Sequence, residues 1–226
     1  MSDLLYHIKR TIIRYDKDSS GATRDVDILG TFTDLAAAKD AADVALASEG
    51  YLPADFDIYD QKSKFPFEEW KHDDGVMVYA KAPTGPVFEV GLDTEINKGG
   101  FKGSKKGEVE VLQTTINYNI DRTGASQFTL VEGTFPTKTL AAAAALTTLL
   151  DDEITEESFA EFDVKDNFKG EWPYGEDCLV RAVGPTGENY FVRVKEPLRK
   201  GHRCKNGKCG CGDKAGCKQE GCKCPA

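Results

Sequence analysis

Hydrophobic and polar residues alternate in paired segments along most of the chain. Residues 6–15 and 114–120 alternate in this way, and each segment is followed by a polar turn that contains glycine. A second alternating segment comes after each turn, at 26–32 and 128–135. Because successive side chains of a strand point to opposite faces, each pair of segments predicts a β-hairpin.

Two more pairs of strands are predicted further along the chain. Residues 75–82 and 86–93 flank the turn "APTG", and residues 177–184 and 189–196 flank "GPTG". The glycine of each turn can adopt the positive φ that such turns require.

An Ala-rich helix is expected between the hairpins of each set. Thr33 or Asp34 is a suitable N-cap for the first helix, and Thr137 or Thr139 for the second. One helix packed on one face of an antiparallel sheet buries these patterns, so the predicted fold class is α+β.

The same order of elements occurs twice because the sequence itself repeats. "GTFTDLAAA" at 30–38 returns as "GTFPTKTLAAA" at 133–143, and Trp70 has a counterpart in Trp172. We therefore expect two tandem β-β-α-β-β repeats with an antiparallel sheet and one helix each. The predicted domains are a first repeat at 1–96, a Gly/Lys linker at 97–110, a second repeat at 111–197 and a Cys-rich tail at 198–226.

Charge is distributed unevenly between the body and the tail. Residues 198–226 hold eight Lys or Arg and two acidic residues, a net charge of +6, so the remainder of this chain of net charge −9 carries −15. The strongly acidic body argues against nucleic-acid binding. No apolar run reaches the length of a membrane span, and the N-terminal residues lack the pattern of a secretory signal, so we expect a cytoplasmic protein without a membrane partner.

No catalytic arrangement is evident in the duplicated body, which we expect not to be an enzyme. His7 and His72 lack partners in the sequence pattern that would make either one a base, and we interpret both as solvated side chains on a polar face. Cys178 is interpreted as a small buried residue rather than a nucleophile. The acidic segments 68–74 and 151–157 lack the spacing of a calcium loop and are interpreted as solvated surface.

Six of the seven cysteines lie in the tail at regular spacing. The pattern C-x4-C-x-C occurs twice, with a period of 13 residues. The candidate metal ligands are Cys204, Cys209, Cys211, Cys217, Cys222 and Cys224, with His202 as an additional ligand.

Thiolates at this density favour soft or borderline metal ions, and Cu(I) or Zn(II) are the expected cofactors. Three sulfurs in each half suit trigonal Cu(I), whereas two Zn(II) ions would need bridging sulfurs or the loan of His202. Beyond Leu198 the tail has no large aliphatic or aromatic residue, so it has no core of its own and metal binding would supply its order.

The tail resembles a metallothionein at residues 202–226, through its repeated Cys-x-Cys pairs and its small, Lys-rich spacers in "CGCGDKAGCKQEGCKC". In that family the cysteines are the ligands, and the role is metal storage, buffering and detoxification. The resemblance therefore implies metal buffering, tolerance or delivery with the six tail cysteines as ligands. The body at 1–197 carries no family resemblance.

Other interpretations of the tail remain open. The six cysteines could form disulfides in an exported protein, or act as a redox-sensing cluster. The body could be a protein-interaction or assembly module that the tail regulates, or an enzyme with a pocket between the two copies.

Overall fold

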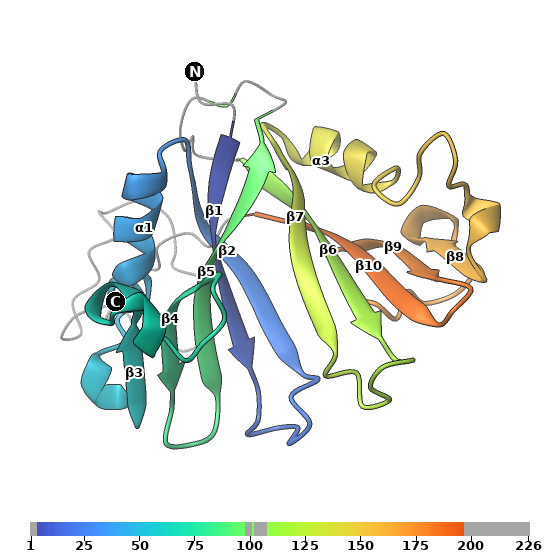
Figure 1. The fold of residues 1–226 in the computed structure, drawn as a ribbon. Helices are drawn as coiled ribbons and strands as arrows, with labels where there is room; N and C mark the ends of the chain where they lie inside the picture. The colour runs from blue at the N-terminus through green and yellow to red at the C-terminus, as the bar shows by residue number, and fades with distance from the viewer. Residues whose placement is uncertain (1–3, 98–100, 102–107, 197–226) are drawn as a thin grey trace, which may run out of the picture.

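The computed structural model describes residues 4–97, 101 and 108–196, which form two five-stranded antiparallel sheets with few helices (Figure 1). The predicted antiparallel sheets and the helix in each half are present, but the described part of the chain is mostly β. The α+β prediction is therefore confirmed only in this coarser form. We call residues 4–96 the first unit and residues 109–195 the second unit.

The first sheet has the strand order β2-β1-β5-β4-β3. Its strands are β1 (Leu4–Ile13), β2 (Arg24–Phe32), β3 (Ile58–Gln61), β4 (Val76–Lys81) and β5 (Val87–Ile96). The helices of this unit are α1 (Leu35–Asp43), α2 (Ala45–Ser48) and the 3-10 turns η1 (Pro53–Asp55), η2 (Lys62–Lys64) and η3 (Phe67–Glu69).

The second sheet repeats this order as β7-β6-β10-β9-β8. Its strands are β6 (Val109–Asn117), β7 (Gln127–Phe135), β8 (Glu161–Val164), β9 (Cys178–Val183) and β10 (Glu188–Lys195). The helices are α3 (Lys138–Ala145) and the 3-10 turns η4 (Glu156–Ser158) and η5 (Lys165–Asn167).

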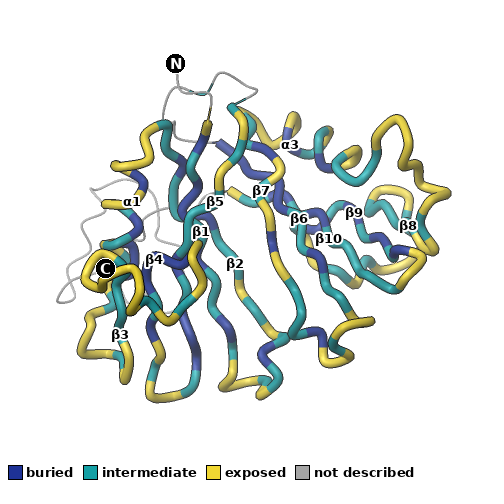
Figure 2. The backbone as a smooth tube through the Cα atoms, viewed as in Figure 1, coloured by how far each residue is buried: buried dark blue, intermediate teal, exposed yellow. Residues whose placement is uncertain are grey.

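Each unit has its own apolar core between its helix and its sheet. In the first unit Ala42 and Leu46 pack against Val78 and Val90. In the second unit Ala141 and Ala145 pack against Val180 and other strand residues. Small alanines let the helix backbone lie close to the sheet, and the buried positions concentrate on the central strands (Figure 2).

The predicted caps and turns are present. The Asp34 carboxylate accepts a hydrogen bond of 2.8 Å from the backbone N–H of Ala37, and the Thr137 hydroxyl accepts one of 3.3 Å from the N–H of Leu140. Gly85 and Gly187 have φ values of 111° and 99°, as the Pro-Thr-Gly turns were predicted to require. Sequence patterns therefore located both helices and both late hairpins.

The predicted four-stranded repeat was wrong in one respect, because each sheet has a fifth strand. β3 and β8 are only four residues long, and each pairs with one neighbour at the edge of its sheet. A strand that short shows too little alternation to be recognised. In addition, β6 begins at Val109, which lies before the predicted start at 114 and inside the segment assigned to the linker.

The two sheets meet along β1, β2 and β5 of the first unit and β7 of the second (Figure 1). In this view α1 lies to the outside of the first sheet, and α3 lies to the outside of the second. Within the described residues, no helix is both long and apolar enough to cross a bilayer.

Candidate functional site

The predicted metal ligands, His202 and the six tail cysteines, lie outside the described residues. Within residues 4–97, 101 and 108–196, no group of three or more His, Cys, Asp or Glu side chains is arranged to hold a metal ion. The chemically distinctive features of the described body are its buried titratable groups and the contact between the two units.

Cys178 is the first residue of β9, and none of its surface is exposed. Its thiol donates a hydrogen bond of 3.4 Å to the carbonyl oxygen of Val180. Burial raises the pKa of the Cys178 thiol to about 11, although nearby Arg193 opposes the shift. The interpretation of Cys178 as a small buried residue is confirmed, because a thiol that remains protonated and enclosed is a poor nucleophile and a poor metal ligand.

His72 was also expected to be solvated, but its side chain is only 18% exposed and is part of an aromatic stack on the first sheet. Its ring lies 3.9 Å from that of Tyr79 in a stacked arrangement and 4.8 Å from that of Trp70 in an edge-on arrangement. The ring nitrogen Nε2 lies 2.9 Å from a carboxylate oxygen of Asp60.

The second unit contains the corresponding stack with different residues. Trp172 contacts Tyr174 at 4.9 Å, and the Arg181 guanidinium lies 5.4 Å from the Tyr174 ring. Arg181 is paired with Asp163, which lies opposite it on β8 just as Asp60 lies opposite Tyr79 on β3. Tyr174 takes the place of His72, so the second unit forms the same aromatic stack without an imidazole.

His7 was expected to be solvated, and this prediction was wrong. None of its surface is exposed. Its Nδ1 lies 3.0 Å from the Thr31 hydroxyl, and its Nε2 lies 3.2 Å from a carboxylate oxygen of Glu95. The polar face of β1 is turned toward the second unit, because Lys9 donates to Thr129 and Thr31, the partner of His7, contacts Glu110.

Glu110 occupies the position in the second unit that His7 occupies in the first. Each is the cross-strand partner of the threonine in a Gly-Thr-Phe segment, Thr31 for His7 and Thr134 for Glu110. Glu110 is only 1% exposed, and its Oε1 lies 3.5 Å from the Thr31 hydroxyl across the boundary between the units. His7, Thr31 and Glu110 therefore form a buried polar chain between the two sheets.

Two atoms of this cluster lack a hydrogen-bond partner among the described residues, Glu110 Oε2 and the Thr134 hydroxyl. Burial raises the pKa of Glu110 to about 8, and the neighbouring carboxylates Glu108 and Glu95 also raise it. An isolated ionised carboxylate is costly to bury, so Glu110 favours its protonated form at neutral pH.

The rest of the junction has an approximate two-fold symmetry. Arg24 donates to the carbonyl oxygen of Ala125 at 2.8 Å, and Gln127, its counterpart, donates to that of Ala22 at 2.7 Å. These reciprocal bonds join equivalent positions, as in the isologous interface of a two-fold dimer.

Two lysines at non-equivalent positions bond to equivalent acceptors in the two units. Lys9 donates to the carbonyl oxygen of Thr129 on β7, and Lys195 donates to that of Val26 on β2, each at 2.6 Å. β2 and β7 are edge strands, and unpaired edge carbonyls are open to pairing with other chains. Each unit therefore covers the open edge of the other with a cation.

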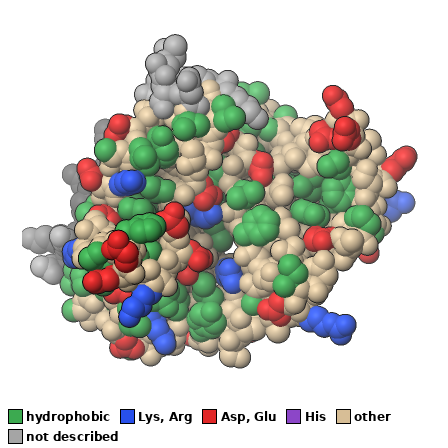
Figure 3. Space-filling view, in the orientation of Figure 1, with side chains coloured by type: hydrophobic (Ala, Val, Ile, Leu, Met, Phe, Trp, Pro, Cys, Tyr) green, Lys and Arg blue, Asp and Glu red, His purple; other side chains and the backbone are tan. Residues whose placement is uncertain are grey.

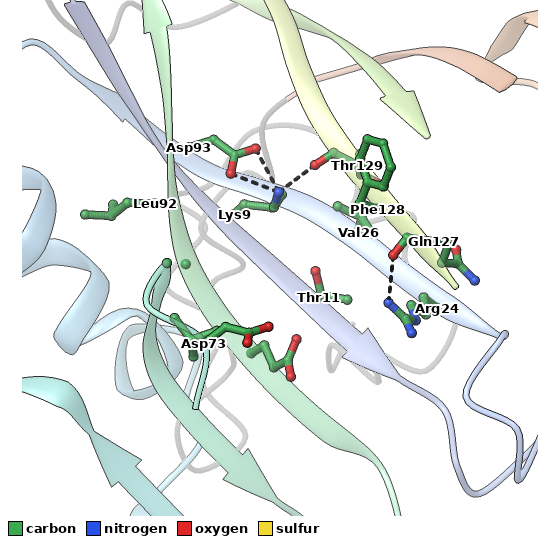
Figure 4. A pocket seen from close by; sticks show the side chains of 14 residues that line it. Lys9, Thr11, Arg24, Val26, Asp73, Leu92, Asp93, Gln127, Phe128 and Thr129 are labelled. Carbon is green, nitrogen blue, oxygen red and sulfur yellow. Dashed lines mark hydrogen bonds and ion pairs between the residues drawn. The ribbon is translucent and has the colours of Figure 1, made fainter. Parts of the chain in front are cut away.

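A groove of about 270 Å³ lies on one side of the junction, between the first sheet and β7. The Lys9 ammonium lies between the Asp93 carboxylate and Thr129, and Arg24 reaches toward Gln127 (Figure 4). Burial raises the pKa of Glu89, which lines the same groove. The space-filling view shows the surface hollowed between the units, with Lys or Arg and Asp or Glu side chains at the rim (Figure 3).

This groove supplies positioned charges, but its cations are already engaged. Lys9 is held by Asp93 and Thr129, and Arg24 donates to Gly21, Ala125 and Gln127. The arrangement stabilises the junction, and the described residues show no nucleophile with an adjacent base in it.

Sequence reasoning did not identify the junction. A signal was present in the sequence. When the two copies are aligned, His7 corresponds to Glu110 and Arg24 corresponds to Gln127, and all four are polar residues in otherwise apolar or alternating strands. Polar residues at equivalent positions of two copies indicate a contact between the copies only if these positions are known to face each other. The sequence does not provide that knowledge.

No known protein family, no curated protein and no solved structure matches this chain.

Proposed function

We propose that this protein binds Cu(I) or Zn(II) through the thiolates of its C-terminal tail and acts in cytoplasmic metal buffering, tolerance or delivery. The observation that carries the proposal is the repeated C-x4-C-x-C spacing, with Cys204, Cys209 and Cys211 followed 13 residues later by Cys217, Cys222 and Cys224. Two half-sites of three thiolates match the ligand preference of soft metal ions.

The charge of the tail supports this role. Its net charge of +6 would balance the six negative charges of the fully deprotonated thiolates. Neighbouring cations favour the thiolate over the thiol, and only the thiolate is an effective ligand. His202 is proposed as a further ligand for Zn(II), which prefers four.

The body supports the proposal because its described residues offer no accessible thiol that would compete with the tail for metal. Its described cysteine, Cys178, is enclosed and has a raised pKa, so it would not compete with the tail for a soft metal. We propose that the two units derive from one duplicated α+β unit and act as a carrier for the tail, with a binding role rather than a catalytic one.

Native mass spectrometry of the full chain expressed with added copper or zinc tests this proposal. We expect about two Zn(II) or about four Cu(I) per chain, lost after alkylation of the tail thiols. Replacement of Cys209 and Cys222 by serine should lower the metal content, whereas Cys178→Ala should leave it unchanged. A metal-free mass lower by about two hydrogens for each disulfide would instead favour the disulfide alternative.

A second candidate is a protein-interaction module, which one feature of β7 favours. Phe128 and Leu130 are 49% and 45% exposed on this edge strand, and their counterparts in the first unit are Asp25 and Asp27. The fold therefore does not require apolar residues here, and an exposed apolar stripe is typical of contact surfaces. Phe128→Asp should weaken capture of a partner by the body without residues 198–226, while Phe67→Asp serves as a matched exposed control.

A further inference from the structure

The hydrogens of the buried chain His7–Thr31–Glu110 satisfy all of its contacts in one protonation state but not in another. The Thr31 hydroxyl has one proton, and it lies within reach of both His7 Nδ1 and Glu110 Oε1, at 3.0 and 3.5 Å. A hydroxyl donates one hydrogen bond at a time. Thr31 can therefore donate either to the imidazole or to the carboxyl group, and the other neighbour must donate to Thr31.

With a proton on Glu110, all three contacts are satisfied. The carboxyl group donates to Thr31, Thr31 donates to His7 Nδ1, and His7 Nε2–H donates to the Glu95 carboxylate, 3.2 Å away. In this arrangement the proton on Glu110 completes the chain.

Removal of that proton leaves one contact repulsive. Ionised Glu110 then takes the Thr31 hydrogen, so neutral His7 must donate from Nδ1 to Thr31. The lone pair of Nε2 is then directed at the Glu95 carboxylate. If His7 keeps its hydrogen on Nε2 instead, two acceptors, the Nδ1 lone pair and ionised Glu110, compete for the one Thr31 hydrogen.

The charges around Glu110 do not compensate for this loss. Glu108 precedes it on the same chain segment, and Glu95 faces it from β5; both raise its pKa. Lys195 lies opposite it on β10, but this ammonium is bound to the carbonyl oxygen of Val26 and to Asp27.

The remaining charges on the first unit are also committed. Asp93, the cross-strand neighbour of His7 on β5, is paired with Lys9. On β7 the residue opposite Glu110 is uncharged Thr134, whose hydroxyl has no partner among the described residues.

We propose that the junction between the two units is a proton-operated latch, in which one proton shared by Glu110 and His7 through Thr31 holds the sheets together and its loss at alkaline pH loosens them. The latch joins equivalent positions of the two units, where the first copy has a base, His7, and the second an acid, Glu110. Two copies with the same residue at this position would place His beside His or Glu beside Glu, so the divergence also favours pairing of unlike units.

Solution NMR of the full chain from pH 6 to 9.5 tests the latch. We expect the Glu110 carboxyl carbon and the His7 ring nitrogens to shift with one common midpoint near pH 8. Backbone amides of β2 and β7 at the junction should shift with the same midpoint, whereas those of the distant edge strands β3 and β8 should not. A Glu110 midpoint near its ordinary value of 4.5, or a His7 ring that does not change when Glu110 titrates, would overturn the proposal.

Glu110→Gln provides the variant test, because the amide can donate to Thr31 at every pH. The His7 and junction shifts near pH 8 should disappear in this variant and persist in Glu188→Gln, a control at the first residue of β10, whose carboxylate accepts hydrogen bonds from Asn119 and Thr186. Persistence of both shifts in Glu110→Gln would refute a shared proton. If Glu110→Gln does not fold, the coincidence of the two midpoints in the unmodified protein still decides the question.

Discussion

The seven thiols of this chain should react with an alkylating reagent in two well-separated groups. Iodoacetamide modifies the thiolate, so the rate depends on the thiolate fraction and on access to the sulfur. Cys178 is disfavoured in both respects, because none of its surface is exposed and its pKa is raised from 9.0 to about 11.

The size of the effect follows from the burial of Cys178. The residue lies on β9, between β8 and β10, so the reagent reaches it only after the sheet opens. Burial is also the main cause of the raised pKa, and a thiol exposed by opening regains its ordinary pKa, so the two effects do not multiply. If opening costs at least about 5 kcal/mol, the open population is below about one in a thousand, which predicts a rate at least about 10³-fold lower than that of a tail thiol.

The assay is intact-mass analysis during alkylation of reduced, metal-free protein at pH 7.5. We expect six adducts to form in one phase and the seventh only after addition of denaturant. Peptide mapping should assign the slow adduct to Cys178, and Cys178→Ala should keep the six-adduct phase and lose the seventh. Seven adducts in a single phase, or early modification of Cys178, would refute this reasoning.

Three further predictions concern the body. In urea unfolding, the free energy of unfolding should fall from pH 4.5 to 8 by at most about 1.4 kcal/mol per pH unit, because folded Glu110 keeps a proton that the unfolded chain has released. Glu110→Gln should flatten this slope, and a flat profile for the unmodified protein would contradict the raised pKa of Glu110. Leu112→Ala, at a side chain 1% exposed that lines a cavity together with Arg24 and Val26 of the first unit, should cost about 2–5 kcal/mol. Leu130→Ala on β7 should change stability by less than about 1 kcal/mol, so equal losses in thermal unfolding would argue against the junction. His72→Tyr should preserve the melting temperature better than His72→Ala, since Tyr174 fills the corresponding place in the second unit. A lower melting temperature for His72→Tyr than for His72→Ala would show that the imidazole has a role beyond packing.

The sequence predicted the elements whose signals are local. The helix caps Asp34 and Thr137 and the turn glycines Gly85 and Gly187 act within a few residues, so their roles could be recognised from the residues around them. The duplication helped, because each signal occurs twice. The short edge strands β3 and β8 were missed because four residues carry too little alternation.

The junction could not be predicted because it depends on contacts between distant parts of the chain. His7 has the pattern of a polar-face residue of an alternating strand, but it is buried and lies within hydrogen-bond reach of Thr31 and Glu95, which are 24 and 88 positions away. The same holds for Lys9, which bonds to Thr129, a residue 120 positions away. Periodicity indicates which side chains share a face, but it does not show what covers that face.

X-ray absorption at the metal edge of the purified, metal-loaded chain tests the central claim most directly. For zinc we expect sulfur neighbours at about 2.3 Å, with at most one nitrogen neighbour from His202, and this sulfur signal should disappear when the six tail cysteines are replaced by serine. Neighbours at about 2.0–2.2 Å that consist of oxygen and nitrogen alone, or a sulfur signal that survives the six replacements, would contradict the assignment of the tail as the metal site.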